Sequence, residues 1–339
     1  MHQVLTEIAI LPELLEGAYN AVNVCLRIQP GEHTVIITDE ETKEIAAALA
    51  HEVQKVSTPP DVYIIEDYSP RPIVDMPQEI LDDLEHAQIS IFAAQAQRGE
   101  LGSRIQMTNV INRKKIRHAH MVNINRQIML EGMRADFLAV DELSTKAITK
   151  ARKAKQIKVT SAAGTDMIAD FSPNLRWVKT SGLISPDKWG NLPGGEIFTA
   201  PQNVNGRFVV DGVVGDYLCQ KYGDIKNTPL ILDIKENRIS NVESVNEELK
   251  QEFIAYTSTD ENSNRVGEFA IGTNIALNSV IGHILQDEKL PGIHIAFGNP
   301  YGEHTGQSWT STTHIDCVGR DFNIWMDDEI IMDNGKFLI

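Results

Sequence analysis

The sequence is poor in cysteine and contains no long apolar run. Only three of its 339 residues are cysteine: Cys25, Cys219 and Cys317. So few cysteines, in an odd number, argue against a disulfide framework and favour a reducing compartment. No window approaches about 18 uncharged apolar residues, which excludes a membrane-spanning helix. The first residues lack the basic flank and apolar run of a signal peptide, so we expect a cytoplasmic protein without a membrane partner.

Basic residues are also scarce. The chain has 31 lysine and arginine residues against 47 aspartate and glutamate residues, which gives a net charge of −16. Nucleic-acid binding depends on neutralising phosphates with basic side chains, so we expect no nucleic-acid partner. The one dense basic run, residues 113–117, is interpreted as a solvated loop or helix end.

The composition is otherwise typical of a globular protein, with 42% hydrophobic and 23% charged residues. A chain of this length buries enough surface to need no disulfide or metal for its core. The length favours two domains, and the pattern changes near residue 155. We therefore expect an α/β domain over residues 1–155 and a mixed α+β domain over residues 156–339.

The first part alternates helix and strand patterns. Apolar spacing predicts helices over 11–27 and 80–84, and Asp39 is expected to cap a helix that reaches His51. Apolar β-branched runs predict buried strands over 34–38, 62–65, 89–93 and 118–124. This alternation is typical of a three-layer α/β domain with a parallel sheet. The turn at 38–41 is acidic and has no glycine, which argues against a pyrophosphate-binding loop.

The second part contains short β-like runs separated by glycine. We expect strands over 157–161, 177–179, 196–199, 208–210, 230–234, 268–271, 292–297 and 321–326. Helices are expected over 142–155, 243–255 and 275–285, and hairpins around Asp211-Gly212 and around residues 327–329. These elements predict a mixed, largely antiparallel α+β domain.

Two glutamates stand out in this second part. Glu196 follows a Gly-Gly turn at the start of a strand. Glu268 lies inside an apolar strand, where a lone carboxylate is costly unless it is paired or binds a metal. Taken singly, each also fits a structural role, as a solvated edge glutamate or as one partner of a salt bridge.

Histidines and further carboxylates follow. Glu288 precedes a strand in which His294 faces away from its isoleucine neighbours. His314 and Asp316 are two residues apart in an extended segment and so project from the same face. Singly, a strand histidine is typical of a protein core, and a His-x-Asp pair is common by chance. Together, six oxygen and nitrogen ligands suit two adjacent divalent ions better than a structural zinc, which favours cysteine.

These segments resemble a known family. Pro193–Pro201 (Pro-Gly-Gly-Glu-Ile-Phe-Thr-Ala-Pro), Gly267-Glu268, His294 with Tyr301, and His314-Ile-Asp316 resemble, in order, four segments of the aminopeptidase T, aminopeptidase S and PepS metallopeptidases. The resemblance covers roughly residues 190–320, which makes the second domain the metal-binding, catalytic one. The interval from Glu288 to His294 is one residue longer than in that family.

The resemblance implies a homodimeric metalloaminopeptidase that releases N-terminal residues from short peptides. Its two divalent ions (zinc, cobalt or manganese) would be held by Glu196, Glu268, Glu288, His294, His314 and Asp316. Such an ion pair activates a shared water. Glu196 or Glu268 would then act as the general base, and Tyr301 would donate a hydrogen bond to the oxyanion.

Two alternatives remain open. A related branch of the same fold is similar to the 2,5-dihydroxypyridine dioxygenases, which open an aromatic ring with a single Fe(II). His294, His314 and Asp316 would supply its two histidines and one carboxylate. The other alternative is a non-catalytic protein with an inert metal site.

Overall fold

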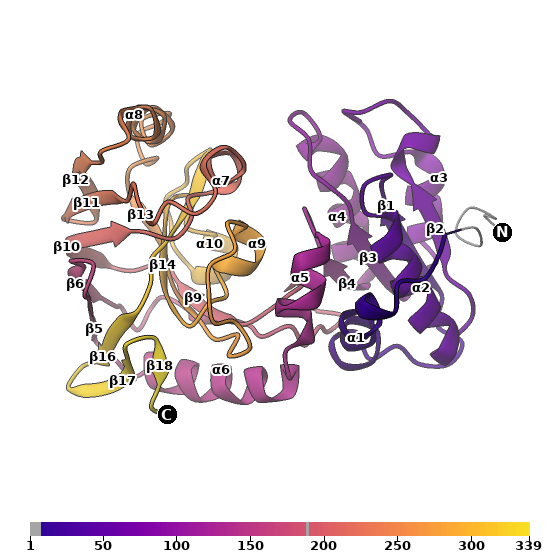
Figure 1. The fold of residues 1–339 in the computed structure, drawn as a ribbon, viewed down its shortest axis with the longest axis horizontal. Helices are drawn as coiled ribbons and strands as arrows, with labels where there is room; N and C mark the ends of the chain where they lie inside the picture. The colour runs from indigo at the N-terminus through magenta and orange to yellow at the C-terminus, as the bar shows by residue number, and fades with distance from the viewer. Residues whose placement is uncertain (1–7, 188–189) are drawn as a thin grey trace. The chain divides into compact units, whose positions relative to one another are not determined.

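The computed structural model describes residues 8–187 and 190–339, and the chain divides into two compact units (Figure 1). The first unit contains the chain up to Leu138 together with Gly182–Gly194, and the second contains Ala139–Ser181 and Gly195–Ile339. The change of pattern in the sequence predicts the division at residue 155 instead. The difference has two causes. The helix α6 (Phe137–Ala151) contributes to the core of the second unit, and the strand β8 (Gly190–Asn191) joins the sheet of the first.

The first unit is built on a parallel sheet, here called sheet A, with strand order β2-β1-β3-β4-β8. Its other strands are β1 (Thr34–Thr38), β2 (Asp61–Ile64), β3 (Ile89–Ala93) and β4 (Arg117–His120). The helical segments are η2 (Pro12–Leu14), α1 (Leu15–Tyr19), the π-helical η3 (Asn20–Cys25), α2 (Lys43–Val56), η4 (Ile65–Asp67), α3 (Gln78–Leu84), α4 (Leu101–Lys114), α5 (Arg126–Leu130) and η5 (Gly132–Arg134).

The apolar strands of sheet A are buried on both faces. Every residue of β1 and β3 is buried, as expected for parallel strands between two helical layers. One face packs against α3 and α4, through Val35, Ile37 and Phe92. The right-handed crossover rule places α2 on the opposite face, since β2 and β3 lie on opposite sides of β1. The prediction of a three-layer α/β fold is thus confirmed.

Several boundaries in the first unit differ from the prediction. The helix expected from Asp39 begins at Lys43, after a turn in which the Asp39 carboxylate accepts hydrogen bonds from the backbone N–H and the hydroxyl of Thr42. The strand β4 ends at His120, short of the predicted residue 124. The helix α4 was not predicted, because its glycine-flanked start resembles a turn. The basic run lies at its end, where Arg113 and Lys114 pair with Glu85.

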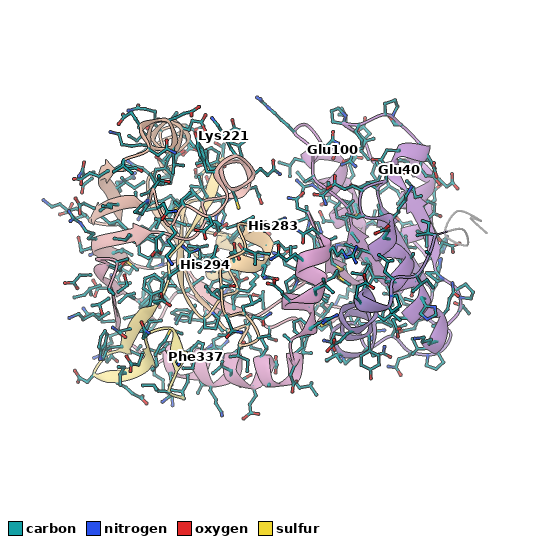
Figure 2. The ribbon with its side chains drawn as sticks, viewed as in Figure 1. Glu40, Glu100, Lys221, His283, His294 and Phe337 are labelled. Carbon is teal, nitrogen blue, oxygen red and sulfur yellow. The ribbon has the colours of Figure 1, made fainter. Side chains whose placement is uncertain are left out.

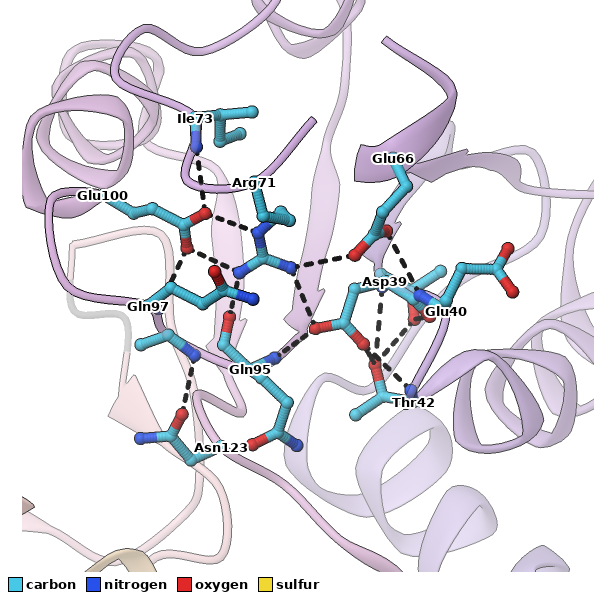
Figure 3. Close-up of polar contacts among 12 residues, drawn as sticks. Asp39, Glu40, Thr42, Glu66, Arg71, Ile73, Gln95, Gln97, Glu100 and Asn123 are labelled. Carbon is cyan, nitrogen blue, oxygen red and sulfur yellow. Dashed lines mark hydrogen bonds and ion pairs between the residues drawn. The ribbon is translucent and has the colours of Figure 1, made fainter. Parts of the chain in front are cut away.

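A buried network of charges joins the loops that follow the strands of sheet A (Figure 3). The guanidinium of Arg71, whose side chain is 7% exposed, pairs with Asp39, Glu66 and Glu100. Asp39 also accepts from the backbone of Gln95 at 2.6 Å. These loops lie where open parallel sheets commonly bind ligands. In this chain the Arg71 network ties them to one another.

The second unit contains two antiparallel sheets. Sheet B has the order β12-β11-β10-β6-β5-β16-β17-β18, and sheet C has the order β15-β14-β13-β9-β7. The strands of sheet B are β5 (Gln156–Ser161), β6 (Asp166–Asp170), β10 (Asn203–Val210), β11 (Leu230–Lys235), β12 (Arg238–Glu243), β16 (Phe322–Met326), β17 (Glu329–Asp333) and β18 (Lys336–Phe337). Those of sheet C are β7 (Val178–Thr180), β9 (Glu196–Thr199), β13 (Val266–Gly272), β14 (Gly292–Gly298) and β15 (His314–Val318). The remaining helices are α7 (Asp216–Tyr222), α8 (Glu247–Tyr256), α9 (Ile284–Asp287) and α10 (Gly302–Thr305).

The core of this unit contains alternate residues of both sheets. On sheet C, Ile293, Ile295 and Phe297 of β14 point into it, together with Ile315 and Cys317 of β15. The period of two predicted for the His294 strand is therefore confirmed. The residues that alternate with these, among them His294, Ala296, His314 and Asp316, lie on the opposite face of sheet C.

Two predicted elements of the second unit are wrong. The Asp211-Gly212 hairpin is a loop, because β10 pairs with β11 and Val214 bridges to Cys317 of β15. The helix expected over 275–285 is reduced to α9, because the Asp287 carboxylate accepts three backbone N–H groups from residues 281–283 and holds them in a loop. The hairpin around residues 327–329 is present between β16 and β17.

All three cysteines are free and buried. Within the described ranges, no helix combines the length and the apolar character needed to cross a bilayer.

Candidate metal centre

The face of sheet C that points away from the core carries the predicted ligands. Glu196 starts β9, Glu268 lies in β13, His294 in β14, and His314 and Asp316 in β15. The strand register sets Glu268 opposite Ala296 and Ala296 opposite Asp316. Figure 2 shows His294 within the body of the unit, whereas Lys221 lies at its periphery. The pairing of the strands thus brings side chains that are up to 120 residues apart in the chain onto one surface.

Small residues form the floor of this surface. His294 has Ala270 as its neighbour on β13, and Glu196 has Gly272. The strand β14 ends at Gly298, whose φ is +107° and where an added Cβ would lie 2.1 Å from the carbonyl oxygen of Thr313. Glycine is required at that position, and it brings the start of β15 close to the end of β14. On this face of sheet C the long ligand side chains therefore have alanine and glycine as neighbours.

The imidazoles and carboxylates converge. The Nε2 atom of His294 lies 3.4 Å from Oε1 of Glu268 and 3.5 Å from Oε2 of Glu196. The Nε2 atom of His314 lies 3.4 Å from Oδ1 of Asp316 and 3.9 Å from Oε2 of Glu268. Single ligand atoms of Glu196, Glu268 and His294 lie within 4.8 Å of one another, as do those of Glu288, His294 and Asp316. All six predicted ligands are therefore brought together.

The tautomer of His314 suits a metal ligand. Its Nδ1 lies 2.9 Å from the backbone carbonyl oxygen of Asn299, which can only accept, so Nδ1 carries the proton. The lone pair of the neutral ring is then on Nε2, which faces Asp316 and Glu268. Metal-bound histidines are usually oriented by such a bond.

The electrostatics distinguish the carboxylates. Burial disfavours ionisation of Asp316, but His314 and His294 outweigh it and lower the pKa of Asp316 to about 2. Burial instead raises the pKa of Glu268, against the attraction of the same histidines. Burial lowers the pKa of the imidazoles, but the surrounding carboxylates raise it overall, to about 9 for His294 and about 10 for His314. The site is therefore built to attract a positive charge, and the two histidines keep Asp316 ionised.

A residue not singled out from the sequence lies at the centre of this group. Lys289, with a side chain 1% exposed, donates to Glu196 at 2.7 Å and to Glu288 at 2.6 Å. Glu196 also accepts from the Thr180 hydroxyl at 2.8 Å. Burial raises the pKa of Glu288 to about 8, against the attraction of Lys289. The only signal in the sequence was a lysine beside a predicted ligand, just before an apolar strand.

Tyr301 lies against His314, with ring centroids 4.6 Å apart, and its other ring neighbour is Phe198. Although 41% of the residue is exposed, burial and the site's carboxylates raise the pKa of Tyr301 well above its usual value. Its hydroxyl is therefore a proton donor at neutral pH. Within the described residues, one further group of metal-ligand types is found in the first unit, His33 with Asp61 and Asp83.

Comparisons with known proteins bear on this centre. The model of the family described as NicX: 2,5-dihydroxypyridine 5,6-dioxygenase matches residues 121–339, a range that includes all six predicted ligands of the second unit. The chain belongs to this family. Membership in the NicX family supports an enzyme with a metal cofactor. No curated protein matches the sequence.

Solved structures show the same fold. A 2,5-dihydroxypyridine dioxygenase from Pseudomonas putida KT2440 is 14% identical, with 96% of each chain covered and a TM-score of 0.70. Wild-type AmpT from Thermus thermophilus is 15% identical, with 96% of this chain and 99% of that chain covered and a TM-score of 0.70. At these identities the similarity establishes the fold alone. The resemblance stated from the sequence is confirmed in part: both of its branches share the fold, and the family match is to the dioxygenase branch.

Proposed function

We propose that this chain is a single-metal dioxygenase that opens a dihydroxylated heteroaromatic ring of the 2,5-dihydroxypyridine type. The observation that carries the proposal is that His294, His314 and Asp316 meet on two adjacent strands within the range matched by the NicX family. In such a reaction one ring C–C bond breaks, and each of its two carbons gains one atom of O2. One O2 is therefore consumed for each ring opened, without another reductant.

The donor set fits Fe(II). Two imidazole nitrogens and one carboxylate, with further positions open, are the ligands of non-haem iron oxygenases. The ordered Nδ1 contact of His314 and the low pKa of Asp316 prepare both groups for a cation. When bound, Fe(II) supplies the oxygen activation that ring opening needs.

The chain's own residues prepare the substrate's surroundings. Tyr301 retains its proton and is partly exposed beside His314, so it can donate a hydrogen bond to a ring oxygen. Glu268 lies between the two imidazoles and, with a raised pKa, can accept or return a proton of a ring hydroxyl. Ala296 contributes only a methyl group between Glu268 and Asp316.

A metalloaminopeptidase is the second candidate. Glu196, Glu268 and His294 present ligand atoms within 4.8 Å of one another, which a single His-His-Asp site does not need. The fold shared with AmpT is compatible with this alternative. In that case Glu196 or Glu268 would serve as general base, and the substrates would be short peptides. Homodimerisation stays a prediction.

The deciding experiment combines metal content with two assays. Protein purified without added metal is analysed for metals per chain, then reconstituted anaerobically with Fe(II) and mixed with 2,5-dihydroxypyridine in an oxygen electrode. The proposal predicts O2 uptake equal to the ring consumed, and none for the His314→Ala variant. A parallel dipeptide panel with zinc, cobalt or manganese tests the hydrolase. Peptide release without O2 uptake would refute the dioxygenase proposal.

A further inference from the structure

Lys289 is the one ammonium group that the described structure places among the candidate ligands. It enters from the segment between α9 and β14, and its side chain is almost completely buried. Its Nζ atom bridges Oε1 of Glu196 and Oε1 of Glu288. A buried ammonium is costly unless it is paired, and here it is paired twice.

This bridge divides the four carboxylates of the site. Glu196 and Glu288 share Lys289, and Glu196 also lies 3.5 Å from His294, whereas Glu268 and Asp316 pair with the two imidazoles. A divalent ion held by both Glu196 and Glu288 would lie beside the ammonium and be repelled by it. The two carboxylates that a second ion would need are therefore already neutralised in part by a cation of the chain itself.

The histidine geometry leads to the same conclusion. The two groups that could hold an ion, one with Glu196 and Glu268 and one with Glu288 and Asp316, both include His294. A neutral imidazole has a single unprotonated nitrogen, so His294 can bind only one ion at a time. The nitrogen that faces Glu196 and Glu268 is Nε2. The two groups thus compete for His294.

We propose that Lys289 takes the place of a second metal ion and limits this site to one. The inference rests on the metal site of the proposed function and concerns how many ions that site accepts. The ion pairs agree with it, because the Lys289 ammonium already lies between Glu196 and Glu288, where a second divalent ion would have to bind.

The test is a titration of the metal-free full-length protein with Mn²⁺, followed by electron paramagnetic resonance. The wild type is expected to bind one Mn²⁺ per chain and to show the signal of an isolated ion. Lys289→Met removes the ammonium at similar side-chain length. It is expected to bind two Mn²⁺ per chain, with the altered signal of two magnetically coupled ions.

Lys221→Met is the matched control. Lys221 also bridges two glutamates, Glu248 at 2.8 Å and Glu252 at 2.7 Å, but its side chain is 35% exposed and lies on α7 (Figure 2). This variant should keep a stoichiometry of one. If Lys289→Met does not fold without metal, refolding it with one and with two equivalents of Mn²⁺ shows which amount restores the far-ultraviolet circular dichroism of the wild type. Recovery that requires two equivalents supports the inference.

Two coupled ions in the wild type would overturn the inference, as would a stoichiometry of one in the folded Lys289→Met variant. These outcomes are separate from the failure of the proposed function. A wild-type protein that binds one ion but consumes no O2 with any dihydroxylated ring refutes the dioxygenase and leaves the role of Lys289 supported.

Discussion

Glu268 and Asp316 lie two strands apart on sheet C, with Ala296 directly between them in the register. The side chain of Ala296 is a single methyl group, so it occupies little space between the two carboxylates. The spacing of the acidic groups around an ion therefore depends on a residue that has no ligand atom of its own.

Enlarging Ala296 should abolish metal binding while the fold persists. The Ala296→Leu side chain would fill the space between Glu268 and Asp316, at a cost of about 1–3 kcal/mol in stability from overpacking. The matched control is Ile295→Val, on the same strand but facing the core. It should lose about 0.5–1.5 kcal/mol and keep its metal. Elemental analysis and urea unfolding measure both effects, and normal metal content in Ala296→Leu would contradict the prediction.

Removing an imidazole from the site should release the metal. His314→Ala deletes a ligand whose Nε2 faces Asp316, so metal affinity should fall by more than the ~10–100-fold typical of losing an outer-shell partner. His304→Ala removes an exposed imidazole on the nearby helix α10 and should bind metal like the wild type. Calorimetric titration with Fe(II) or Mn²⁺ compares the variants. Equal affinities would exclude His314 as a ligand.

The Arg71 network should make a large contribution to stability in the first unit. Arg71→Met leaves Asp39 and Glu100 buried without their cation, and breaking a buried pair in this way costs about 3–5 kcal/mol. Arg113→Met instead breaks a solvent-exposed pair with Glu85, and such pairs contribute little to stability, so its loss should be much smaller. The free energy of unfolding in urea distinguishes the two. Similar losses for both variants would show that the network is not a stabilising unit.

The buried histidines of β4 should make the first unit sensitive to acid. His118 bonds to Ser90 at 2.8 Å and lies 3.1 Å from His120. Burial, with a smaller contribution from Arg104, lowers the pKa of His120 from 6.5 to about 3. The unfolded chain therefore takes up a proton below pH 6.5 that the folded chain excludes. The contribution of neutral His120 to the free energy of unfolding is therefore fully present above pH 6.5 and is lost progressively as the pH decreases toward 3.

At pH 5 the loss attributable to His120 should be about 2 kcal/mol, because one pKa unit corresponds to about 1.36 kcal/mol. Urea unfolding at pH 7.5 and pH 5 measures it, and His120→Asn should remove this part of the pH dependence. His86→Asn, at an exposed position, should leave it unchanged. An NMR titration in which His120 protonates near pH 6.5 would refute the argument.

Local patterns in the sequence determined much of this protein. The apolar β-branched runs predicted β1 and β3 to the residue, since a strand buried on both faces leaves an unmistakable signal. The period of two also placed His294 opposite the core residues Ile293 and Ile295. The ligand types, and the His314–Asp316 pair on one face, were available from the chain alone.

Only the tertiary structure decided the rest, because it depends on pairings between distant segments. Strand register places Glu268, Ala296 and Asp316 in one row, and no local pattern encodes it. The Asp211-Gly212 segment was predicted as the tip of a hairpin, but it lies in a loop because β10, which precedes it, pairs with β11. Lys289 was an ordinary lysine in the sequence. Burial between Glu196 and Glu288 makes it part of the metal site, since the energy of a charge depends on what surrounds it in space.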